Sequence, residues 1–138
     1  MTQRIECDPG EESSGADARD PLTARIIGCA IGVHRTIGPG LLEATYEEAM
    51  CVELSIANLK YARQVAFPIL YKGRAIGEYR LDLLVDDQVI VEIKSVERRD
   101  PVFDAQVLTY LRATGKKVGL LMNFNSRFLR DGIKRFVQ

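Results

Sequence analysis

The sequence contains no long apolar run, few cysteines and no excess of either charge. Its longest stretch without a polar side chain, residues 26–33, is much shorter than the roughly 20 residues that a membrane-spanning helix needs. The first residues also lack the basic segment followed by an apolar segment that marks a secretory signal. These absences exclude a membrane-spanning protein and favour a cytoplasmic one, without a membrane partner.

The three cysteines exclude two further classes of protein. Cys7, Cys29 and Cys51 are odd in number and have no CxxC spacing, so neither a disulfide framework nor an iron–sulfur cluster with four cysteine ligands is available. Cys29 and Cys51 fall within apolar helical patterns. We expect both to be buried as small hydrophobic residues.

The composition predicts one soluble globular domain with an acidic tail. The chain has 138 residues, 46% hydrophobic and 28% charged, which suits one domain with its own core. Residues 1–20 hold six acids and two bases, net −4, whereas residues 21–138 hold thirteen acids and seventeen bases, net +4. Residues 1–19 have few large apolar side chains and are predicted to be disordered. The domain then spans 20–138, and its mild basic excess suits a polyanionic partner or an ordinary solvated surface.

The periodicity of apolar residues predicts a mixed sheet flanked by helices. Asp20-Pro21 and Asp100-Pro101 each combine a helix N-cap with proline at the first helical position. Pro68 favours an edge position for the first central strand. The predicted helices span 21–37, 42–60 and 101–114, and the predicted strands span 65–71, 75–85, 89–95, 117–124 and 133–137. Because a helix precedes strand 117–124, this strand is expected to join the sheet by a crossover and to be buried on both faces.

Two acids and a lysine stand out within these apolar strands. Glu92 and Lys94 are two residues apart in VIVEIKSV and therefore project to the same side of a strand. The polar break at 86–88 predicts a hairpin that brings Asp82 to that side as well. Such a group suits binding a hard cation and activating water beside a phosphate. A structural ion pair is the alternative, but charges within apolar strands are unfavourable unless they are paired or bound to metal.

Three other polar residues are candidates with ordinary explanations. Glu43 lies in the first turn of the second predicted helix, where the helix dipole favours an acid. Gln106 and Tyr110 are four residues apart in the third predicted helix and therefore share a face. A glutamine and a tyrosine in this arrangement are more often packing residues than catalytic ones.

The motifs together resemble a known group of proteins. GLLEATYEEAM fits the GxxExxY pattern of a group of small bacterial proteins, with Gly40, Glu43 and Tyr46 at the named positions. Asp82 followed by Glu92-Ile93-Lys94 resembles the PD-(D/E)xK nuclease superfamily. Gln106 through Tyr110 resembles the QxxxY motif of its RecB-like branch. The resemblance covers roughly residues 22–138.

This resemblance implies a fold, a cofactor and roles for the site residues. The implied fold is the restriction-endonuclease-like αβββαβ core, of mixed α/β class, which agrees with the predicted element order. Asp82 and Glu92 would bind Mg²⁺ or Mn²⁺, and Glu43 would complete the acidic site directly or through water. Lys94 would orient the attacking water and offset charge on the phosphate.

The resemblance assigns weaker roles to three other residues. Gln106 and Tyr110 would hold substrate or brace the site. His34 lies in the VHR stretch that the group shares and is a weak candidate for approaching the metal, since a lone helical histidine is more often packed or exposed.

Three functional hypotheses follow. The first is a metal-dependent nuclease acting on nucleic acid, with DNA the expected substrate. The second is a nucleic-acid-binding or regulatory module that keeps the fold without turnover, and the third is a defence or toxin–antitoxin partner. The intact Asp82, Glu92 and Lys94 favour the first, since paired acids repel phosphate without metal. A single site attacks one strand at a time, so cleavage of both strands predicts a homodimer.

Overall fold

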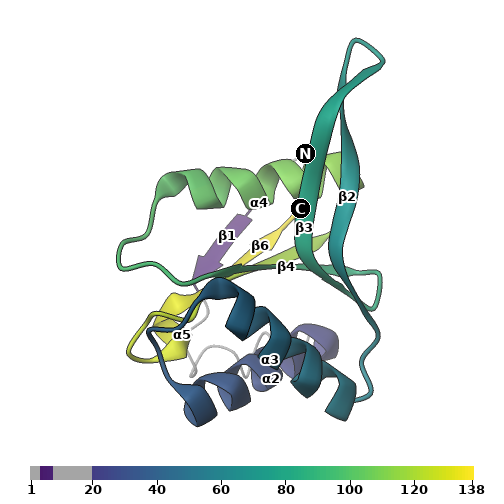
Figure 1. Cartoon of the computed structure of the whole chain (residues 1–138). Coiled ribbons are helices and arrows are strands. Elements are labelled where there is room, and N and C mark those ends of the chain that lie inside the picture. The colour runs from purple at the N-terminus through teal and green to yellow at the C-terminus, as the bar shows by residue number, and fades with distance from the viewer. Residues whose placement is uncertain (1–3, 8–19) are drawn as a thin grey trace.

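The computed structural model describes residues 4–7 and 20–138 and forms one six-stranded mixed sheet with helices on both faces (Figure 1). The strands lie in the order β1-β6-β5-β4-β3-β2. The helices are α2 (Pro21–Ile37), α3 (Glu43–Ile56), α4 (Pro101–Thr114) and the short α5 (Leu129–Gly132). The strands are β1 (Arg4–Cys7), β2 (Tyr61–Tyr71), β3 (Arg74–Val85), β4 (Val89–Lys94), β5 (Val118–Asn123) and β6 (Ile133–Val137). The predicted mixed α/β class with flanking helices is confirmed.

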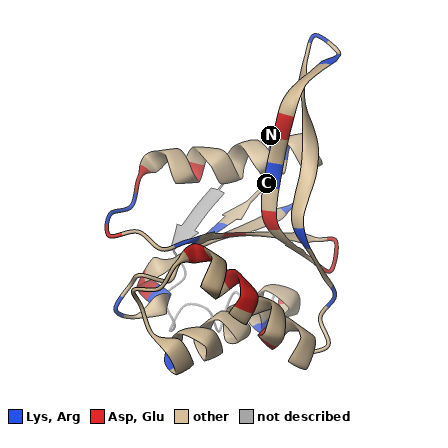
Figure 2. Ribbon diagram, in the orientation of Figure 1, with Lys and Arg blue, Asp and Glu red and all other residues tan. Residues whose placement is uncertain are grey.

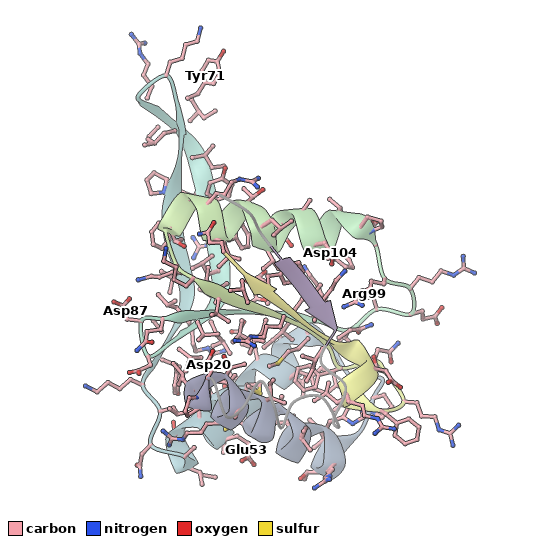
Figure 3. The ribbon with its side chains drawn as sticks, turned by 180° about the vertical axis from the view of Figure 1, so that it is seen from behind. Asp20, Glu53, Tyr71, Asp87, Arg99 and Asp104 are labelled. Carbon is pink, nitrogen blue, oxygen red and sulfur yellow. The ribbon has the colours of Figure 1, made fainter. Side chains whose placement is uncertain are left out.

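The hairpin of β2 and β3 forms one edge of the sheet and extends beyond the body of the molecule (Figure 1). Its turn residues Lys72 and Gly73 both have positive φ, 49° and 80°, as in the two-residue turns that match the twist of a hairpin. Tyr71 lies near the tip, in solvent (Figure 3). The edge position of the strand that contains Pro68 is confirmed.

Helix α4 carries the chain across one face of the sheet. β4 pairs antiparallel with β3 and parallel with β5, and a parallel pair requires such a crossover. The Asp100 side chain accepts a hydrogen bond of 2.9 Å from the Val102 N–H at the start of α4, and Gly115 ends the helix in a left-handed conformation. The central residues of β5 are buried. The crossover and the buried strand are therefore as predicted.

The sheet has a hydrophobic core on each face. One core packs α2 and α3 against residues such as Leu83 and Val91, and the other packs α4 against residues such as Leu81 and Ile90. β3 therefore passes from one core to the other around Asp82, which lies between Leu81 and Leu83. The strand that carries the candidate acid is anchored on both sides of it.

Four features differ from the sequence-based expectations. β2 begins at Tyr61 rather than at 65. α3 ends at Ile56 rather than near 60, because Asn58 adopts a left-handed conformation (φ 58°) that asparagine tolerates. Residues 4–7 form β1, paired antiparallel with β6, whereas the composition of 1–19 predicted disorder. The prediction for the rest of that segment falls on 1–3 and 8–19, outside the described residues. The short α5 was not predicted.

The expectations about the cysteines and about the apolar segments can be compared with the structure. Cys29 and Cys51 are both buried in the core on the α2–α3 face, as predicted. Within the described residues, no helix is both long enough and apolar enough to cross a membrane.

Candidate active site

The paired acids lie where β3 and β4 separate. The backbone pairing between these strands ends at Leu83 and Val91. Beyond that pair, the side chains of Asp82 and Glu92 form the hydrogen bonds between the strands. Glu92 Oε2 accepts a hydrogen bond of 2.9 Å from the Asp82 N–H, and Asp82 Oδ2 accepts one of 2.8 Å from the Ile93 N–H. Each carboxylate therefore uses one oxygen to hold the opposite strand. The other oxygen of each is the one that a cation would bind.

Burial makes the charged form of both acids unfavourable. Glu92 is only 2% exposed. Desolvation, reinforced by the nearby charge of Asp82, raises the pKa of Glu92 from 4.5 to about 8, although Lys94 acts in the opposite direction. Burial also raises the pKa of Asp82, against the hydrogen bond from Ile93. A divalent cation would supply the positive charge that this pair lacks.

Lys94 lies beside the acids and is held by α4. Its Nζ donates a hydrogen bond of 3.3 Å to Gln106 Oε1 and lies 4.6 Å from the centre of the Phe103 ring. An ammonium has three donors, so this arrangement leaves donors for water or phosphate. Because Lys94 contacts α4 and alters the pKa of Glu92, the structure brings Lys94, Glu92 and Gln106 together.

Tyr110 of α4 lies at the border of the site. It is buried, and its ring meets that of Tyr79 edge-on at 5.6 Å. Burial and then the charge of Glu92 raise the pKa of Tyr110, against a side-chain hydrogen bond with Gln106. A cavity of about 390 Å³ adjoins this cluster and is lined by Lys94, Gln106, Tyr110 and Tyr79 among others. This cavity offers space for substrate next to the lysine.

Glu43 lies at the start of α3, at the margin of the site. Its side chain is exposed, and its charge contributes to the raised pKa of Glu92. The loop before it contains Gly38 and Gly40, whose positive φ values of 70° and 94° favour glycine. Tyr46 holds this loop, because its hydroxyl donates to the Gly38 carbonyl (2.6 Å) and accepts from the Leu41 N–H (3.1 Å). Tyr46 therefore has a positioning role for the helix end that carries Glu43.

We expect Tyr46→Phe to destabilise the protein. Tyr46 is fully buried and stacks on Phe124 at 4.6 Å, so phenylalanine keeps the packing but leaves two backbone groups without their partner. The loss should be about 1–3 kcal/mol. The matched control is Tyr71→Phe, because Tyr71 is 60% exposed and should change stability by less than about 0.5 kcal/mol. Equal melting temperatures for the two variants would refute this role.

The structure adds Glu47, Arg63 and Gln64 to the candidate site. Glu47 is buried and accepts hydrogen bonds from Arg63 Nη2 (2.8 Å) and from Gln64 Nε2 (2.7 Å). The charge of Glu47 contributes to the raised pKa of Asp82, whereas the Gln64 side chain acts to lower it. The sequence signal for Glu47 was its position four residues after Glu43, on the same face of a helix. Nothing in the sequence marks Arg63 or Gln64.

Gln64 also has an unusual backbone. It falls opposite Asp82 in the register of β2 and β3, and its φ is 49°, a left-handed conformation that is rare for a residue with a side chain. Strained positions of this kind cluster at functional sites. Figure 2 shows acidic positions on α3 and β3 in this part of the molecule. Asp82 therefore lies between Gln64 of β2, whose backbone conformation is irregular, and β4, which separates from β3 at this point.

His34 is placed elsewhere. Its Nε2 forms a hydrogen bond of 2.8 Å with the Ser126 carbonyl, before α5, and the side chain lines a different cavity. The other candidates gather around Glu92, so the structure does not bring His34 into their group.

The donor set fits a hard divalent cation held by two carboxylates. Among the described residues, no group of three or more His, Cys, Asp or Glu side chains is arranged to hold a metal ion. Mg²⁺ typically binds to proteins through one or two carboxylates and takes its remaining ligands from water and substrate phosphate. Asp82 and Glu92 meet that requirement.

The fold and site together define the class of protein. A mixed sheet with the parallel pair β4–β5 joined by α4, and with paired acids and a lysine where β3 and β4 separate, is the restriction-endonuclease-like fold. A family model described as the PD-(D/E)XK nuclease superfamily matches residues 20–136, and the chain belongs to this superfamily. No curated protein and no solved structure matches the chain significantly.

Proposed function

We propose that the protein is a nuclease that uses Mg²⁺ or Mn²⁺ to hydrolyse phosphodiester bonds in DNA. The observation that carries this proposal is the buried pair Asp82 and Glu92 at the separation of two strands, with Lys94 beside it. Superfamily membership supports phosphodiester cleavage as the reaction. Carboxylate oxygens suit hard cations such as Mg²⁺ and Mn²⁺.

Each side chain has a role in this proposal. Asp82 and Glu92 would hold the cation, which polarises the phosphate and lowers the pKa of a bound water. Lys94, held between Gln106 and the Phe103 ring, would orient the attacking water and stabilise the negative charge that develops on the phosphate. Gln106 and Tyr110 would position Lys94 and line the space for substrate.

Two finer assignments belong to the same proposal. We propose that the chain belongs to the GxxExxY group, because the loop that contains Gly38 and Gly40 is held by the Tyr46 hydroxyl, which gives a structural reason for that pattern. The contact of Gln106 with both Lys94 and Tyr110 supports placement in the RecB-like branch. Glu43 would then bind the cation through water, since its side chain is exposed at the margin.

A cleavage assay tests the proposed reaction. Single- and double-stranded DNA and RNA are incubated with the protein and Mg²⁺, Mn²⁺ or EDTA, and the fragments are separated by length. We expect DNA cleavage with either cation and none in EDTA. Asp82→Asn should abolish cleavage because it removes a charged ligand. Cleavage that persists in EDTA, or no cleavage under any of these conditions, would refute the proposal.

A further inference from the structure

A second cavity, of about 660 Å³, lies between the C-terminal end of α2 and the segment before α5. Its lining includes His34, Arg35, Arg127, Phe128 and Arg130, and none of the described residues that line it is acidic. Figure 2 shows basic positions in the chain segment next to α5. The lining therefore favours an anionic ligand.

An exposed aromatic ring accompanies these cations. Phe128 is 52% exposed, and the guanidinium groups of Arg127 and Arg130 lie 5.2 and 6.0 Å from its ring centre. Within the described residues, Arg35 and Arg127 have no ion-pair partner. A flat apolar face next to unpaired cations matches a nucleotide, which presents a base to stack and a phosphate to bind.

The cavity is close to the candidate active site along the chain. Pro39 lines the cavity, and two residues later the Leu41 carbonyl accepts a hydrogen bond of 2.5 Å from Ser95 Oγ. Ser95 directly follows Lys94. Because consecutive Cα atoms are about 3.8 Å apart, this path from Pro39 to Lys94 is no longer than about 20 Å. At the rise of a stacked strand, about 3.4 Å per nucleotide, that distance corresponds to at most about six nucleotides, and to fewer in an extended single strand.

We infer that this cavity holds an unpaired nucleotide of a single-stranded DNA substrate a few nucleotides from the bond that is cut. The inference rests on the proposed function and adds the strandedness of the substrate to it. Arg35 and Arg127 bind backbone phosphates, and Phe128 stacks on the base. A single strand fits this arrangement because the faces of bases in a duplex are already stacked on their neighbours, whereas unpaired bases are available to aromatic side chains.

Binding measurements in EDTA test the inference without cleavage. Fluorescein-labelled single-stranded oligodeoxynucleotides of about 4 and about 16 nucleotides are titrated with the full chain at several salt concentrations, and anisotropy gives the affinity. We expect the longer probe to bind more tightly, since it can reach from the cavity past the active site, a path of at most about six nucleotides. Phe128→Ala should weaken binding about 5- to 150-fold with an unchanged salt slope, because stacking is worth about 1–3 kcal/mol per base.

The charge variants give a different signature. Arg35→Gln with Arg127→Gln should reduce the salt slope by about 1.4, at about 0.7 for each phosphate contact of a single strand. The control is Lys60→Gln with Lys117→Gln, which removes the same charge from exposed residues outside the cavity lining and should leave the slope nearly unchanged. Melting curves confirm that the variants, all at exposed positions, remain folded.

Three results would overturn the inference. These are binding by the variants that equals that of the parent, an equal effect of Phe128→Ala on a 16-base-pair duplex, and binding of deoxyadenosine monophosphate as tight as that of the longer probe. The last result would indicate a mononucleotide site instead. Failure of the proposed function is distinguishable, because a protein without cleavage activity would still show cavity-dependent binding in EDTA.

Discussion

Glu92→Gln should stabilise the metal-free protein at pH 8 and abolish its stabilisation by Mn²⁺. In the folded protein the pKa of Glu92 is raised to about 8, from 4.5. Between these values the unfolded chain is ionised and the folded chain holds the proton, so stability falls as pH rises from about 4.5 to 8. Glutamine has no proton to lose, and its side-chain oxygen can still accept from the Asp82 N–H. The gain is therefore largest at pH 8 and smallest at pH 5.

Thermal melting measures both effects. Without metal at pH 8, we expect Glu92→Gln to melt at least about 5 °C above the parent, since about 1 kcal/mol corresponds to several degrees in a domain of this size. Millimolar Mn²⁺ should raise the melting temperature of the parent but not that of Glu92→Gln, because a ligand bound only to the folded state stabilises it. Glu97→Gln changes the same charge at an exposed position and should behave like the parent. Equal melting of Glu92→Gln and the parent at pH 8 would show that Glu92 is not destabilising.

Lys94→Ala should reduce the rate of DNA cleavage at saturating substrate by at least about a hundredfold, the scale for loss of one contact to developing charge. The fold and metal binding should remain, because the acids are held by backbone N–H groups rather than by the lysine. Lys94→Met keeps an aliphatic chain next to Phe103 and should lose the same activity, which separates charge from packing. The measurement is single-turnover cleavage with Mn²⁺.

A neighbouring cation provides the control for Lys94. Arg98 is exposed in the loop after β4, and Arg98→Ala should leave the rate at saturating DNA within about threefold of the parent while weakening binding, as expected for a phosphate contact. If Lys94→Ala behaved in the same way, Lys94 would be a phosphate-binding surface residue. The chain would then be better described as a nucleic-acid-binding module.

The sequence predicted those parts of the site that depend on local periodicity. Alternation places Glu92 and Lys94 on one side of a strand, and the turn at 86–88 fixes the hairpin that brings Asp82 opposite Glu92. Helical spacing placed Gln106 and Tyr110 on one face of a helix, and the resemblance to the QxxxY motif made them candidates for the site. Each of these relations is set within one element or one hairpin, where pattern and geometry correspond directly.

Other parts of the site and of the fold depend on tertiary contacts, which no local sequence pattern reveals. Arg63 and Gln64 reach Glu47 across two elements, and the left-handed conformation of Gln64 goes against its residue type. β1 forms because β6 offers an edge to pair with, although its own segment is polar. His34 lay in a suggestive motif, but the orientation of α2 directs it to Ser126.

The projecting hairpin has a consequence for the dynamics of the molecule. Residues 70–78 are all exposed, and a two-stranded ribbon without further packing is only marginally stable in water. The outer half of β3 should therefore open and close locally far more often than the whole domain unfolds. Its inner half is fixed between two cores around Asp82. The outer half of β3 is therefore flexible, whereas the inner half is rigid and keeps Asp82 in position opposite Glu92.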